Sequence, residues 1–140
     1  MNMDVIMENN NQKEHKSLTE KFKLFFKGPF LNDKINFWLV ILMFLGNIIN
    51  WLILLVFLKP ATENIILHYN VYFGVDMTGK RSLAYIMPAV GLLLIMINSY
   101  LAGYFHRNNE TIAGYILLVA AFMAQISLII ASFSVIIINY

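Results

Sequence analysis

The stretch INFWLVILMFLGNIINWLILLVFL, residues 35–58, contains 24 consecutive residues without a charged side chain. Two further uncharged stretches follow, one of 25 residues at 82–106 and one of 30 residues at 111–140. About 20 apolar residues in a helix already cross the hydrocarbon core of a bilayer. The sequence therefore predicts an all-α membrane protein, in which residues 35–140 form a domain of three transmembrane helices. Their approximate bounds are 36–58, 83–105 and 112–138.

The composition supports the same class of protein. The chain of 140 residues is 59% hydrophobic and 13% charged, whereas an average soluble domain is about half apolar and about a quarter charged. The 61 residues outside the uncharged stretches are divided among a tail, a loop and a short connection, so we expect no separate soluble domain. The net charge of +2 is too small for a nucleic-acid interface, and the absence of cysteine excludes thiolate chemistry and disulfides.

The sequence before the first uncharged stretch divides into two segments. Residues 1–16 mix charges with three consecutive Asn and lack hydrophobic periodicity, which predicts a disordered tail. Residues 17–34 begin with a capping box, Ser17 and Glu20, and place four apolar side chains on one helical face, Leu18, Phe22, Phe25 and Phe26. This pattern is too short to span a bilayer. We therefore expect an amphipathic helix in the headgroup plane, the alternative being a cap packed on the bundle.

The basic residues near the helix ends predict the orientation. Six of them flank the side of the N-terminus, namely Lys16, Lys21, Lys23, Lys27, Lys34 and Arg107. Three flank the opposite side, namely Lys59, Lys80 and Arg81. Because basic residues accumulate on the cytoplasmic side, we expect a cytoplasmic N-terminus and an external C-terminus. The loop at 59–82 is then external.

This external loop contains the segment IILHYNVYF at 65–73, which is dense in β-branched and aromatic residues and predicts an extended strand. Alternation would place five apolar residues on one side, Ile65, Leu67, Tyr69, Val71 and Phe73, and three residues on the other, His68, Asn70 and Tyr72. Gly74 and Gly79 would supply the turn back to the second helix. We expect an ordered loop packed over the helix ends. A lone strand needs a partner strand, polar helix ends or another subunit to satisfy its backbone.

Polar residues inside the predicted spans are the first candidates for function. At about 1.5 Å per residue, Asn47, Asn50 and Gln125 lie at similar depth, and Asn98 lies nearer the inner surface. Unpaired amides are costly in hydrocarbon, so we expect the first three to hydrogen-bond across helices. The alternative is a polar substrate or ion path. No Asp, Glu, Lys, Arg or His lies within a predicted span, although these residues usually mark a proton or ion path.

The third span carries a stripe of small residues at spacings of seven, four and three: Ala113, Ala120, Ala124, Ser127, Ala131 and Ser134. Small side chains let helix backbones approach closely in lipid. The stripe therefore predicts helix packing, either against the first or second helix of the chain or against another subunit.

The external loop supplies the second group of candidates, the binding residues His68, Asn70, Tyr72 and Asp76. One His and one Asp are fewer than the usual ligands of a transition metal. The sequence contains neither a zinc-protease helix motif nor a phosphate-binding glycine loop. We therefore expect no metal, no cofactor and no catalytic residue, and a protein that is not an enzyme.

This loop resembles the short membrane domain at the start of SdpI-like bacterial immunity proteins, and the chain is similar to uncharacterised three-helix membrane proteins of small-genome bacteria. The family motif is an external Pro-x-His-x-Asn followed by Gly and Asp. His68, Asn70, Gly74 and Asp76 match this order, while Ile66 stands where the family has proline. The likeness covers about residues 36–105. It implies a protein of the bacterial inner membrane that recognises or resists a toxic peptide.

The residues taken together predict a non-enzymatic protein that acts by helix–helix association, as an accessory subunit of a membrane complex or as a homo-oligomer. Its partners would be the lipid bilayer and other membrane subunits or copies of itself. The first alternative is a peptide-binding immunity or sensor module, and the second is a fragment of a transporter or channel.

Overall fold

The computed structural model describes residues 29–59 and 64–140. The predicted disordered tail lies outside these ranges. So do the capping box and the phenylalanine face of the predicted amphipathic helix. The described part of that segment is a four-residue helix, α2 (Pro29–Asn32), which leads directly into the first long helix.

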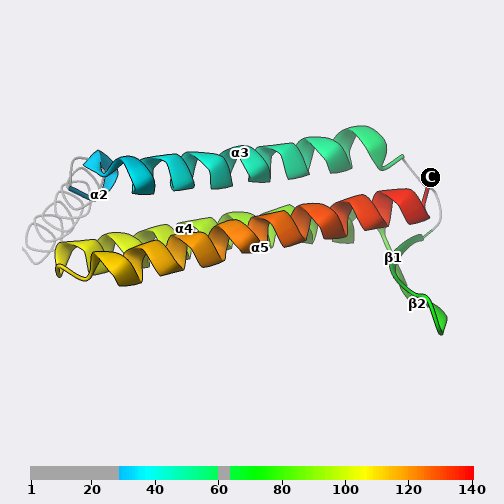
Figure 1. Ribbon diagram of the computed structural model, residues 1–140. Helices are drawn as coiled ribbons and strands as arrows, with labels where there is room; N and C mark the ends of the chain where they lie inside the picture. Colours follow the sequence, from blue (N-terminus) through cyan, green and yellow to red (C-terminus); the bar gives the residue numbers. More distant parts are fainter. Residues whose placement is uncertain (1–28, 60–63) are drawn as a thin grey trace, which may run out of the picture.

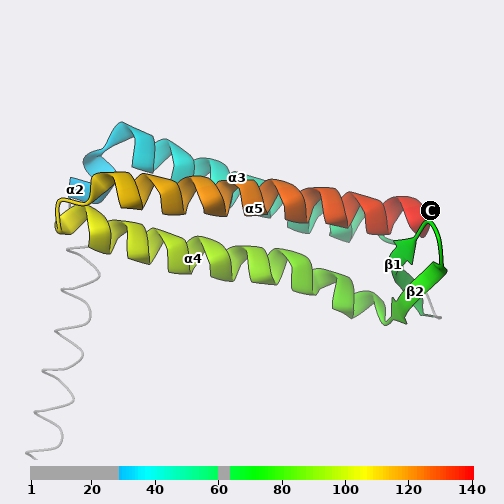
Figure 2. The ribbon, with the colours of Figure 1, turned by 60° about the horizontal axis from the view of Figure 1, so that its bottom comes forward.

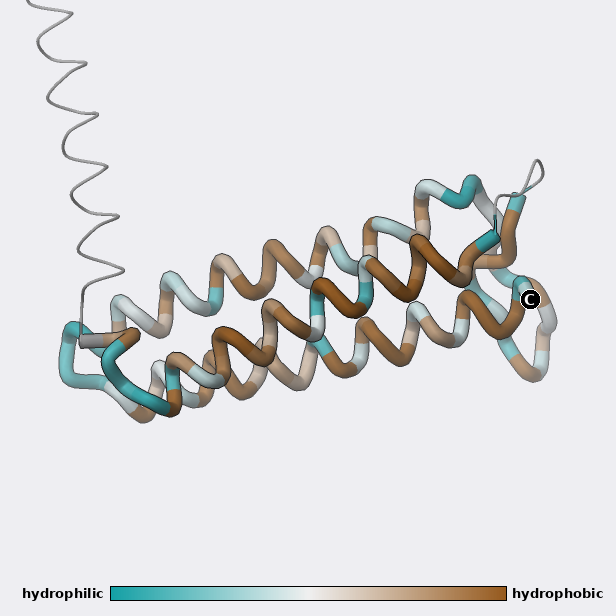
Figure 3. The backbone as a smooth tube through the Cα atoms, turned by 90° about the horizontal axis from the view of Figure 1, so that it is seen from above, coloured by the Kyte–Doolittle hydropathy of each residue, from teal (hydrophilic) through white to brown (hydrophobic). Residues whose placement is uncertain are grey.

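Three long helices run side by side, α3 (Lys34–Phe57), α4 (Ile86–Arg107) and α5 (Thr111–Ile138) (Figures 1 and 2). A short 3-10 helix, η1 (Arg81–Tyr85), leads into α4. Hydrophobic residues cover most of their length, and hydrophilic residues gather at the two ends of the bundle (Figure 3). The predicted three helices that are long and apolar enough to cross a membrane are thus confirmed.

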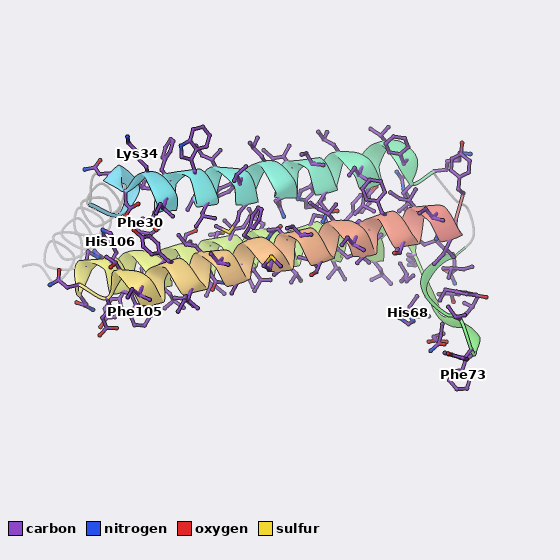
Figure 4. All side chains as sticks on the ribbon, in the orientation of Figure 1. Phe30, Lys34, His68, Phe73, Phe105 and His106 are labelled. Carbon is purple, nitrogen blue, oxygen red and sulfur yellow. The ribbon has the colours of Figure 1, made fainter. Side chains whose placement is uncertain are left out.

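The end of the bundle near Lys34 is held by contacts from every helix. The Asp33 side chain caps α3 by accepting a hydrogen bond from the Ile35 backbone N–H at 2.8 Å. The Tyr115 hydroxyl of α5 donates to the same carboxylate at 2.5 Å. Phe30 of α2 is buried, with its ring 6.1 Å from that of His106 of α4 in an edge-on arrangement. Figure 4 shows Phe30 and His106 close together at this end.

The bundle has two hydrophobic clusters, one toward each end. The cluster near Phe30 also contains Met43, Ile95, Ala102, Leu118 and Ala121. The cluster at the other end contains Leu54, Leu58, Ile65, Ala84, Val135 and Ile136. Ile65 belongs to the loop between α3 and α4, so this loop contributes directly to the core.

The loop forms a β-hairpin, which corrects two predictions. Strand β1 (Ile65–Asn70) pairs antiparallel with β2 (Gly74–Gly79), so the chain is not all-α and the predicted strand ends at residue 70 rather than 73. The chain reverses because the Asn70 side chain accepts a hydrogen bond from the Tyr72 N–H at 2.8 Å, and because Gly74 adopts a positive φ of 83°. The segment expected to be a turn is therefore the partner strand that β1 required.

The end of α5 fixes the base of this hairpin. The Asn139 side chain accepts a hydrogen bond from the Ile66 N–H at 2.8 Å and donates to the Ile66 carbonyl at 2.7 Å. It also donates to the Val135 carbonyl of its own helix at 2.7 Å. One side chain thus pairs with both backbone groups of a strand residue, as a neighbouring strand would do.

Replacing Tyr115 by Phe should lower the stability of the bundle at neutral pH and lower it less in acid. The hydrogen bond from Tyr115 is the largest cause that holds the pKa of Asp33 below its usual 3.8, so ionised Asp33 stabilises the folded state. This contribution is present above pH 3.8 and is lost as the pH falls through the lowered pKa of the folded state.

Thermal unfolding in detergent at neutral and acid pH measures this effect. Tyr104→Phe, which removes the hydroxyl of an exposed tyrosine on α4, is the matched control. An equal loss of stability for Tyr115→Phe at both pH values would show that ionised Asp33 is not responsible.

Candidate functional site

A layer of buried amides joins the three helices between the two hydrophobic clusters. Asn47 of α3 donates through Nδ2 to the Pro88 carbonyl of α4 at 2.8 Å and to Gln125 Oε1 of α5 at 3.4 Å. Gln125 Nε2 donates in turn to the Gly91 carbonyl of α4 at 2.7 Å. In hydrocarbon these bonds replace the water that the amides would otherwise need.

Gly91 makes room for this layer. A Cβ added there would lie 2.7 Å from Asn47 Nδ2 and 2.9 Å from Gln125 Oε1, both far too close. The α4 backbone therefore supplies both the space and the acceptors. The similar depth of the two amides follows from the sequence, whereas their partners, the carbonyls of Pro88 and Gly91, do not. The only available signal was a glycine in the middle of an apolar span.

The other two predicted intramembrane amides behave differently. Asn50 is fully buried, and neither its amide nitrogen nor its oxygen has a hydrogen-bond partner in the part of the chain that the structure describes. Asn98 is half-buried and donates to the Leu94 carbonyl of its own helix at 2.9 Å. Of the three amides expected to hydrogen-bond across helices, Asn47 and Gln125 do so and Asn50 does not.

The predicted small-residue stripe lies beside the internal contact face of α5. The residues of α5 that are buried against the other helices include Gly114, Leu118, Ala121, Gln125 and Ser132. Three residues of the predicted stripe are half-buried, namely Ala113, Ala124 and Ala131. The other three are exposed, namely Ala120, Ser127 and Ser134. At 3.6 residues per turn the two faces are about a third of a turn apart. Within the described part of the chain, half of the stripe is therefore exposed and the other half is only partly covered.

The serines of this stripe do not need a polar partner outside their helix. The Ser127 hydroxyl donates to the Met123 carbonyl at 3.1 Å, and the Ser134 hydroxyl donates to the Ile130 carbonyl at 3.0 Å. Both bonds connect residues four positions apart on the same helix. The stripe can therefore face lipid or another helix without an unpaired donor.

The four candidate binding residues of the loop do not converge on one site. His68 Nδ1 lies 3.1 Å from Asp76 Oδ2, a pair between the two strands in which the side chains are 63% and 36% exposed. Asn70 is engaged with the backbone of the turn, and Tyr72 is almost fully exposed. Within residues 29–59 and 64–140, no three His, Asp or Glu side chains are grouped so that they could hold a metal ion.

No protein family, curated protein or solved structure matches the chain. The resemblance to SdpI-like proteins therefore depends on the residue order in the loop alone. In this chain the four residues of that order have structural roles in the hairpin. Asn70 and Gly74 form the reversal, and His68 and Asp76 pair beside it.

Gly91→Ala should destabilise the bundle, whereas Gly46→Ala should not. A Cβ at Gly46 would meet its nearest neighbour, Ile129 Cδ1, at an ordinary 3.6 Å. Alanine otherwise favours a helix interior by about 1 kcal/mol over glycine, so Gly46→Ala should be neutral or stabilising. The clash at Gly91 should cost on the order of 1–3 kcal/mol. Unfolding of both variants in one detergent measures the difference, and equal effects would contradict the close approach at Gly91.

Asn47→Leu should destabilise the bundle, whereas Asn50→Leu, three residues away on the same face, should not. Asn47→Leu removes interhelical hydrogen bonds worth on the order of 0.6–2 kcal/mol each and leaves Gln125 with one partner fewer. Asn50→Leu removes a buried amide without a partner and should be neutral or stabilising. Reversible unfolding in detergent compares the two variants. A large loss of stability for Asn50→Leu would mean that this amide has a polar partner, which would favour the polar-path interpretation.

Proposed function

We propose that this protein is a non-enzymatic, three-pass membrane protein that acts by helix–helix association, as an accessory subunit or as a homo-oligomer. The association surface is the small-residue face of α5, formed by Ala113, Ala120, Ala124, Ser127, Ala131 and Ser134. The observation that carries this proposal is that the described part of the chain buries none of these six residues and leaves Ala120, Ser127 and Ser134 exposed.

The rest of the α5 surface supports this assignment by contrast. Beside the small-residue face, α5 exposes a row of large apolar side chains, Ile112, Ile116, Met123, Ile130 and Ile137. Large apolar side chains suit contact with lipid tails. A strip of Ala and Ser permits the backbone of another helix to come close and gain dispersion contacts. The two faces thus have different chemistry on one helix.

We further propose that the protein lies in the bacterial inner membrane with its N-terminus in the cytoplasm and its C-terminus outside. The excess of basic residues up to the start of α3 and at the end of α4 supports this orientation. The loop residues that resemble SdpI-like proteins support the bacterial location.

A second candidate function is a peptide-binding module of the immunity or sensor type. The described sheet has two strands only, and Asn139 occupies the outer edge of β1 at Ile66. The outer edge of β2 can accept an extended peptide as a third strand, a common mode of peptide recognition.

Ser127→Leu should weaken association in the membrane on the order of tenfold, since a large side chain would force the helix backbones apart. Ile130→Leu, a change on the neighbouring face of large apolar residues, should have no effect. Blue-native electrophoresis after mild solubilisation, compared with cross-linking in native membranes, measures the association. The chain contains no cysteine, so Ser127→Cys and Ile130→Cys provide single cross-linking positions.

Cross-linking at position 127 and not at position 130 would support the proposed face, and the mass of the product would distinguish a second copy from another subunit. A lone monomer in both measurements would refute the association proposal. In that case, tight binding of an extended peptide by the monomer would favour the second candidate function.

A further inference from the structure

Among the described residues of the loop, the tip of the hairpin is the most exposed apolar segment. Val71, Tyr72 and Phe73 are consecutive, and they are 84%, 91% and 86% exposed. Three large apolar side chains of the two strands are also about half exposed, namely Tyr69, Val75 and Met77. Asp76 is the only Asp, Glu, Lys or Arg between residues 65 and 79. Such a continuous apolar surface marks an interaction with a membrane or a protein.

The base of the hairpin is fixed to the bundle, so the position of the tip is fixed as well. Ile65 is buried in the core cluster, and Asn139 binds both backbone groups of Ile66. A Cβ at Gly79 would lie 2.8 Å from Leu67 Cδ1 and 2.7 Å from Leu83 Cδ1, which shows how closely the second strand packs at the base. The hairpin is anchored through both strands rather than hanging on a free loop.

The hairpin projects sideways from one end of the bundle (Figure 1). It starts at the end of the bundle that holds the C-terminus and projects to the side of the helices rather than continuing along them (Figure 1). Phe73 lies at the far tip, away from the helices (Figure 4). Because the helix axes cross the membrane, a segment that projects sideways from their ends lies over the bilayer around the bundle.

Aromatic and basic side chains mark the same end as the level of the lipid headgroups. Lys59 Nζ lies 4.5 Å from the centre of the Tyr140 ring. The Arg81 guanidinium lies 5.8 Å from the centre of the Tyr85 ring, which stacks on Trp51. Tyrosine and tryptophan belong to the interface between membrane and water, where long basic side chains reach the headgroups.

We propose that the hairpin tip, residues 71–73, inserts into the interface of the leaflet beside the bundle. The ligand is the phospholipid surface itself, contacted by the apolar side chains below the headgroups. The Tyr72 hydroxyl and the backbone of the tip stay at headgroup level, where polar groups find partners. The hairpin is then a lateral anchor that adds a contact with lipid outside the footprint of the three helices. This inference does not depend on the association proposed for α5.

A single fluorescent label on the full-length chain tests the depth of the tip. The chain has no cysteine, so Phe73→Cys and Thr78→Cys can each carry one environment-sensitive nitrobenzoxadiazole group. The protein is placed in nanodiscs of phosphatidylcholine and phosphatidylglycerol, with or without lipid that carries a nitroxide just below the headgroup. We expect blue-shifted emission and strong quenching by the nitroxide lipid at position 73, and weaker quenching at position 78 near the base.

Two outcomes would overturn the proposal. Emission typical of water at position 73, with no quenching by the lipid, would place the tip in solvent. Blue-shifted emission without lipid quenching would mean that protein, such as a second copy of the chain, covers the tip. Val71→Cys repeats the measurement with Tyr72 and Phe73 intact. Because the Val71 and Phe73 side chains are almost fully exposed, replacing either of them removes no packing contact of the fold.

Discussion

The absence of water from the hydrocarbon core is the constraint on which the rest of this structure depends. Backbone amides between the two membrane surfaces must find protein partners, which only helices and closed β-barrels provide. Three uncharged stretches are too few to close a barrel, so they form helices. The same constraint applies to side-chain amides. Asn47 and Gln125 meet it by bonding to each other and to α4 carbonyls, and in doing so they tie all three helices together at one level.

Close approach of the helices follows from these bonds. The carbonyls of Pro88 and Gly91 can accept from Asn47 and Gln125 only because Gly91 has no side chain in the space where the two amides meet. At the end of the bundle near α2, Gly114 similarly lies against the Ala102 backbone. A Cβ added at Gly114 would lie 3.1 Å from the Ala102 carbonyl oxygen. Asn50 differs from Asn47 and Gln125 because neither polar atom of its buried amide has a partner in the described chain. An unpaired buried amide lowers stability.

Non-helical backbone occurs at the bundle ends, where the constraint is relaxed. The hairpin between α3 and α4 pairs the inner edges of its two strands, and Asn139 pairs with Ile66 at the outer edge of β1. Its apolar tip projects sideways (Figure 1), where, as we propose, it inserts into the membrane interface. The faces of α5 divide in the same way among the other helices, lipid and, as we propose, a further helix. The protein thus combines an internal polar layer with several outward surfaces of distinct chemistry.

The sequence by itself determined the three helices, because uncharged stretches of 24 to 30 residues have no other stable form in a membrane. It also located Asn47 and Gln125 at one depth, since helix rise alone sets that position. Only the tertiary structure decided which face of α5 meets α3 and α4, because small residues occur on two of its faces. Only the tertiary structure revealed which groups accept hydrogen bonds from the amides. These groups are backbone carbonyls, which every residue has, so the residue types do not indicate them. The second strand, Gly74–Gly79, could not be predicted from the sequence either. Its glycines suggest a turn, whereas its pairing depends on the reversal at Asn70 and the anchor at Asn139.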